Sequence, residues 1–210
     1  SRGEDIFNMV SHIFGGALGI TAIALCSIFG AKHHNVYGII SGIIFGVTLL
    51  ILYTMSSIYH GLKPERKAKK VFQIIDHCSI FLLIAGTYTP FCLCTLREYN
   101  VALGWSFFGI IWGIAIVGIA LNSIDLKKYR VFSMICYLLM GWLIVWEMKA
   151  IIESTGINAL ILLIAGGIVY TLGSVAYIYG KKVKWLHSVF HIACIIGSTL
   201  HFLSILLYVI

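Results

Sequence analysis

The residues in this chain best suited to chemistry are two histidines, His187 and His191, near the start of its last apolar segment. Residues four apart on a helix lie about one turn from each other on the same face, so both imidazoles can reach one ion. Polar side chains are costly to bury in a membrane, and those found there usually face the interior of a helical bundle. The pair therefore predicts a functional site if other segments bring partners to it.

Candidate partners lie on three other apolar segments. The second segment ends in Ser56 and His60, the third begins near Asp76, and the first carries His12. Three neutral imidazoles, from His60, His187 and His191, together with water match the open tetrahedral site of catalytic zinc. A single carboxylate is too few ligands for calcium or magnesium, so zinc is the expected cofactor.

Asp76 and Ser56 are expected beside this metal. Ser56 lies one turn from His60 on the same face, and Asp76 could hydrogen-bond a ligand imidazole or a metal-bound water. Zinc lowers the pKa of its bound water to about 7, which makes Asp76 the candidate proton acceptor. Plainer interpretations stay open, since Asp76 could cap its helix or pair with a loop lysine, and Ser56 could bond its own backbone. His12 and His77 are interpreted as interior or outer partners, and His201 as structural.

The elements that must position these residues are membrane helices. Of the 210 residues, 60% are hydrophobic and only 11% are charged, which is typical of an integral membrane protein. At about 20 residues per crossing there is room for roughly seven helices. We therefore predict an all-α seven-helix transmembrane bundle forming one domain over residues 1–210, with the first apolar run retained as a span. The expected spans are Asn8–Gly30, Val36–Leu62, Val71–Leu96, Val101–Leu121, Tyr129–Lys149, Ile157–Tyr179 and Trp185–Ile210.

Loop charges predict the orientation of this bundle. Alternate loops hold five, three and three lysines or arginines, and the other loops hold one each. The richer loops contain Lys63, Arg66, Lys67, Lys69, Lys70, then Lys127, Lys128, Arg130, then Lys181, Lys182 and Lys184. By the positive-inside rule they are cytoplasmic, which places the N-terminus inside and the C-terminus outside a cell inner (plasma) membrane. The net charge of +7 is therefore a topology signal, and no nucleic-acid partner is expected.

This orientation brings the polar residues to one depth. Ser56 and His60 end an inward span, while Asp76, His187 and His191 begin outward spans, so all lie in the cytoplasmic half. The six cysteines fall within or at the ends of apolar segments and are expected to be free thiols. Pro90, with Gly86 before it, predicts a kink in the third span.

At this point the chain resembles the hemolysin III and progestin/adipoQ receptor (PAQR) family, in its bacterial branch. The motifs are Ser56-x-x-x-His60, Asp76 on the next span, and His187-x-x-x-His191 on the seventh, and the start Glu4…Asn8…Ser11-His12 is similar too. The resemblance implies a seven-helix bundle with zinc on His60, His187 and His191, beside Ser56 and Asp76. It also implies ceramidase-like hydrolysis for the receptor branch, and a role in haemolysis or membrane homeostasis for the bacterial one.

Several functions stay open at this stage. The first is an intramembrane zinc hydrolase of a lipid amide or ester, and the second is a non-catalytic sensor or regulator with structural zinc and a lipid signal. A pore-forming haemolysin is disfavoured because the helices lack a continuous polar stripe. A haem protein is disfavoured because two histidines on adjacent turns cannot ligate opposite haem faces. The sequence indicates neither the substrate nor the oligomeric state.

Overall fold

The computed structural model describes residues 1–180 and 182–210, so the predicted loop cation Lys181 lies outside the described residues. The elements are α1 (Arg2–Lys32), α2 (Val36–Gly61), α3 (Lys67–Pro90), η1 (Phe91–Leu96), α4 (Arg97–Tyr99), α5 (Val101–Trp142), η2 (Leu143–Glu147), α6 (Met148–Thr155), α7 (Ile157–Tyr179) and α8 (Leu186–Tyr208). Six helical stretches of the described residues are long and apolar enough to cross a membrane. The prediction of an all-helical membrane protein is confirmed.

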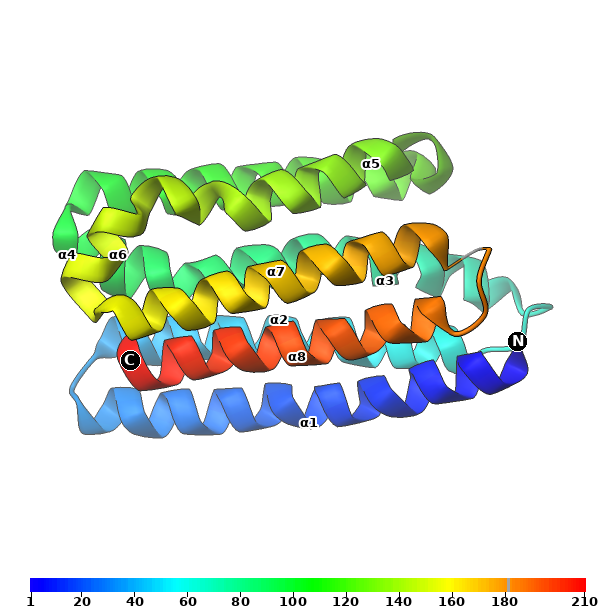
Figure 1. The fold of residues 1–210 in the computed structure, drawn as a ribbon, viewed down its shortest axis with the longest axis horizontal. Coiled ribbons are helices and arrows are strands. Elements are labelled where there is room, and N and C mark those ends of the chain that lie inside the picture. Colours follow the sequence, from blue (N-terminus) through cyan, green and yellow to red (C-terminus); the bar gives the residue numbers. More distant parts are fainter. Residues whose placement is uncertain (181) are drawn as a thin grey trace.

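Helix α5 covers most of two predicted spans and the loop expected between them. A straight helix of its 42 residues would be about 63 Å long, roughly twice the thickness of a bilayer core. The backbone leaves helical geometry at Asp125, whose carboxylate accepts the N–H groups of Lys127 and Lys128 at 3.0 Å. Figure 1 shows α5 as two limbs running side by side, and Ser133 Oγ of the second limb donates to Asn122 Oδ1 of the first at 2.6 Å. Because the aspartate caps the second limb, the reversal needs no longer loop.

Pro90 marks a change of helix type in α3. Proline has no N–H to donate to the carbonyl of Gly86, and a π-helix, η1, follows it directly. Gly86 has a separate role, because a Cβ there would overlap the side chain of Thr48 on α2. The glycine therefore allows α3 to lie close against α2, which carries His60.

Helix α1 is held tightly against α2 by two facing glycines. A Cβ on Gly46 would lie 2.7 Å from the backbone nitrogen of Ile23, and one on Gly19 would lie 2.8 Å from that of Leu50. Small residues at such crossings allow two helix backbones to approach each other. Helix α1 also packs against α8, so it borders both helices that carry the predicted ligands.

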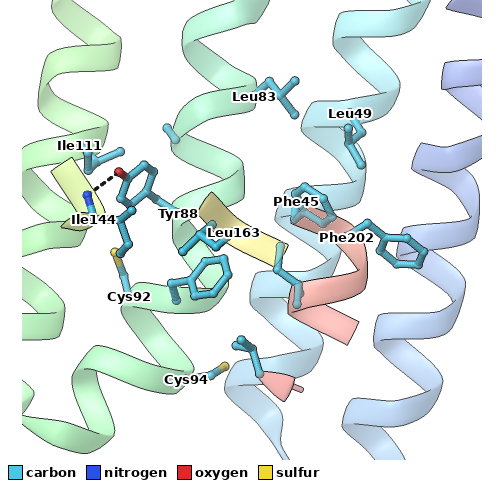
Figure 2. Close-up of a cluster of buried hydrophobic side chains, with 14 of the residues drawn as sticks. Phe45, Leu49, Leu83, Tyr88, Cys92, Cys94, Ile111, Ile144, Leu163 and Phe202 are labelled. Carbon is cyan, nitrogen blue, oxygen red and sulfur yellow. Dashed lines mark hydrogen bonds between the residues drawn. The ribbon is translucent and has the colours of Figure 1, made fainter. Parts of the chain in front are cut away.

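The apolar core joins nearly all the elements (Figure 2). Phe45 of α2 stacks with Phe202 of α8 at a ring-centroid distance of 6.4 Å. The Tyr88 hydroxyl donates to the Met140 carbonyl at 2.6 Å and accepts the Ile144 N–H at 2.9 Å, which ties α3 to α5 and η2. All six cysteines are free, as predicted, and five of them are buried.

The two ends of the bundle differ in the segments they carry (Figure 1). The N-terminus lies at the same end as the α2–α3 connection, the break in α5 and the α7–α8 connection. The C-terminus, the α1–α2 connection, α4 and α6 lie at the opposite end. The segments rich in lysine and arginine therefore gather at the end where α2 finishes and α8 begins.

Candidate metal centre

The first turns of α8 bring His187 and His191 together. Their Nε2 atoms are 3.1 Å apart, and His191 is 2% exposed. Trp185, in the left-handed conformation with φ 67°, precedes the helix, and its N–H donates to a carboxylate oxygen of Glu4 on α1. The two facing nitrogens are close enough to bind one ion.

His60 joins this pair from the last turn of α2. Its ring centroid lies 4.7 Å from that of His191 and 5.4 Å from that of His187, and it is 7% exposed. One nitrogen from each of the three rings lies within 4.8 Å of the others. A tetrahedral ion about 2 Å from each nitrogen would separate the nitrogens by about 3.3 Å, close to the 3.1 Å between the Nε2 atoms of His187 and His191. The three histidines therefore converge as the sequence predicted and could hold a metal ion.

Asp76 and Ser56 border the same space. With His12, His187 and His191 they line a cavity of about 200 Å³. Ser56 of α2 and Asp76 of α3 reach this cavity from two different helices. The structure thus places both residues at one cavity with His187 and His191, while the chemical roles assigned to them stay predictions.

Two residues of α1 contact the ligand histidines directly. His12 Nε2 lies 2.8 Å from His191 Nδ1, and Asp5 Oδ1 lies 3.1 Å from His60 Nδ1. Sequence reasoning considered His12 as an outer partner but did not single out Asp5. The signal that could have found Asp5 is its position seven residues before His12, which is two helical turns and therefore the same face of α1.

The remaining candidate histidines lie at the edge of the site or away from it. His77 contacts the Gln73 carbonyl through Nδ1 at 2.9 Å and the Tyr177 hydroxyl through Nε2 at 3.2 Å, and it lines the cavity beside Asp76. His201 Nε2 lies 3.0 Å from the Leu163 carbonyl oxygen, about 21 Å further along α8 than His187. Within the described residues, His77 is thus a neighbour of the site, whereas His201 connects α8 to α7.

An apolar cavity of about 140 Å³ adjoins the polar one. Leu52, His77, Tyr177, Phe190 and Cys194 are among the residues that line both. The apolar cavity is bordered by α3, the second limb of α5, α7 and α8. A hydrocarbon chain in this cavity would therefore have its end next to the histidine cluster.

Comparisons with known proteins identify the family of this chain. A family model described as "Haemolysin-III related" matches residues 1–202. The chain is 36% identical to the Hemolysin-3 of Bacillus cereus over 207 residues, covering 99% of this chain and 92% of that protein. It is 37% identical to the Hemolysin-3 homolog of Bacillus subtilis (strain 168) over 205 residues, covering 98% and 94%. The chain therefore belongs to the haemolysin-III-related family of multi-pass membrane proteins.

Proposed function

We propose that this protein is a zinc-dependent hydrolase that acts within the membrane on a lipid amide or ester. The observation that carries the proposal is the convergence of three imidazoles, two of which, His187 and His191, line a cavity together with the Asp76 carboxylate. Three neutral nitrogen ligands leave one position of a tetrahedral ion open, which is the arrangement of catalytic zinc sites. When bound, zinc supplies a Lewis acid that polarises a carbonyl and acidifies water.

The membrane arrangement in this proposal has seven crossings, with the N-terminus in the cytoplasm and the C-terminus outside the plasma membrane. Support comes from the break at Asp125, which divides α5 into two limbs, and from the termini, which lie at opposite ends of the bundle. The lysine- and arginine-rich connections share the N-terminal end, as the positive-inside rule requires of cytoplasmic loops. The metal site then lies in the cytoplasmic half.

The side chains of this site have different roles in the proposed hydrolysis. Asp76 takes a proton from the attacking water and returns it to the leaving nitrogen or oxygen, while Ser56 orients the carboxylate. Water adds across the carbonyl, the carbon–nitrogen or carbon–oxygen bond breaks, and the products are a fatty acid and an amine or alcohol. The apolar cavity takes the acyl chain and places its carbonyl near the histidines.

Metal analysis of the purified full chain, followed by lipid analysis, tests the proposal. Wild type should bind about one zinc per chain, and His60→Ala, His187→Ala and His191→Ala should each lose it. Asp76→Asn should keep zinc and lose turnover on a panel of ceramides, phospholipids and other lipid esters. A zinc-loaded wild type that leaves the whole panel intact would refute the hydrolase and favour a sensor or regulator in which zinc is structural.

A further inference from the structure

Helix α1 contacts two of the three clustered imidazoles, those of His60 and His191. His191 presents Nε2 to His187 at 3.1 Å and Nδ1 to His12 Nε2 at 2.8 Å. The two nitrogens of one ring therefore have different partners, one in the cluster and one on α1. This division matters because a histidine ligand uses one nitrogen for the metal and can donate a hydrogen bond from the other.

His60 has a similar contact from the same helix. Its Nδ1 lies 3.1 Å from Asp5 Oδ1, which leaves Nε2 for the cluster. Asp5 and His12 are two helical turns apart and so lie on one face of α1. The close packing of α1 on α2 and its contact with α8 hold this face against both ligand-bearing helices.

We propose that Asp5 and His12 are positioning residues that accept hydrogen bonds from His60 Nδ1–H and His191 Nδ1–H and so direct both Nε2 atoms to the metal. The inference rests on the metal site of the proposed function and adds a role for α1, which carries none of the three ligands. Such outer acceptors fix the ring orientation and tautomer and make the ligand nitrogen more basic.

The proposal also determines the tautomer of the neutral His12 side chain. If His191 donates from Nδ1, His12 Nε2 must be the acceptor, so the neutral His12 carries its hydrogen on Nδ1. His12 is 3% exposed, its ring packs edge-on against Tyr53 at 4.8 Å, and no described residue is a hydrogen-bond partner of its Nδ1. Asp5 differs because its side chain is 41% exposed, so its hydrogen bond competes with water and has the smaller effect.

Zinc affinity of the purified full chain, measured by competition with a chelator of known affinity, tests the proposal. His12→Leu removes the acceptor at similar volume and should weaken zinc binding 10- to 100-fold, whereas His12→Gln keeps an acceptor oxygen and should recover most of that loss. Asp5→Ala should weaken binding up to about 10-fold and Asp5→Asn by less. Nitrogen-15 NMR of labelled histidine should find His12 as the Nδ1–H tautomer.

Matched controls separate positioning from general destabilisation. Ser11→Ala changes the buried neighbour of His12, whose hydroxyl bonds only the Asn8 carbonyl among the described residues, and Glu65→Gln removes an exposed carboxylate. Both should keep wild-type affinity. Equal affinity in His12→Leu and wild type, or an Nε2–H tautomer of His12, would overturn the inference while leaving the metal site intact. If instead wild type binds no zinc, the proposed function itself fails.

Discussion

Replacing His191 by alanine should abolish the stabilisation that zinc gives to the folded bundle. His191 is the most buried of the three ligand histidines and contacts both His187 and His12. An ion bound by His60 on α2 and by His187 and His191 on α8 links two helices that are far apart in the sequence. Because only the folded bundle brings these residues together, the ion stabilises the folded state over the unfolded one.

The size of this effect follows from mass action. Free zinc at 100 times its dissociation constant adds about 2.7 kcal/mol to the free energy of unfolding. For a chain of this length, each 1 kcal/mol raises the melting temperature by roughly 2–4 °C, so zinc should raise it by about 5–10 °C. In His191→Ala the same zinc concentration should fall below the weakened dissociation constant, and the increment should shrink to less than about 1 °C.

The assay is thermal unfolding of the purified chain in detergent, with zinc and with a strong chelator. The matched control is His201→Ala, which removes a histidine of the same helix whose Nε2 contacts the Leu163 carbonyl outside the metal site. This variant should melt lower than wild type in both conditions, because it loses that contact and side-chain packing, yet keep the full zinc increment. An undiminished increment in His191→Ala, or an equal loss in both variants, would refute the reasoning.

Three further predictions concern the proposed role of Asp76, the apolar cavity and helix packing. Asp76→Asn should reduce lipid hydrolysis by about 10²- to 10⁴-fold with zinc content unchanged, and an unchanged rate would remove Asp76 from the reaction. Ser174→Phe places a large side chain in the apolar cavity and should lower the turnover of long-chain lipids more than that of short-chain lipids. The control Gly109→Phe lies on an open surface of α5 and should have no such effect. The measurement is the hydrolysis rate of each purified variant as a function of lipid chain length. Gly46→Ala should destabilise the bundle by roughly 1–3 kcal/mol because its Cβ meets the backbone of Ile23, while Gly113→Ala, which meets nothing within 4 Å, should be close to neutral in thermal unfolding.

The path of the chain departs from the prediction where local backbone chemistry acts. Hydropathy predicted a loop between Leu121 and Tyr129, but the helix continues to Asp125 and restarts at once because that carboxylate caps the next turn. Pro90 was expected to kink a helix, and the structure adds a π-helix directly after it that the sequence did not predict. Hydropathy averages over many residues and does not resolve such single-residue events.

What the sequence determined by itself is which histidines lie at the same level of the bundle. Apolar run lengths predicted the helices, and loop charges predicted their directions, which together placed His60, His187 and His191 at one level. Depth is readable in this way because it depends only on distance along each helix from its end.

Only the tertiary structure decided which of the residues at that level contact one another. Helices that are apolar on nearly every side have no polar face to indicate their rotation or their neighbours, so lateral order depends on close packing such as that between Gly19 on α1 and Gly46 on α2. That packing sets Asp5 and His12 against the outer nitrogens of His60 and His191. The sequence could therefore predict the three histidines that converge, whereas their contacts with α1 required the folded bundle.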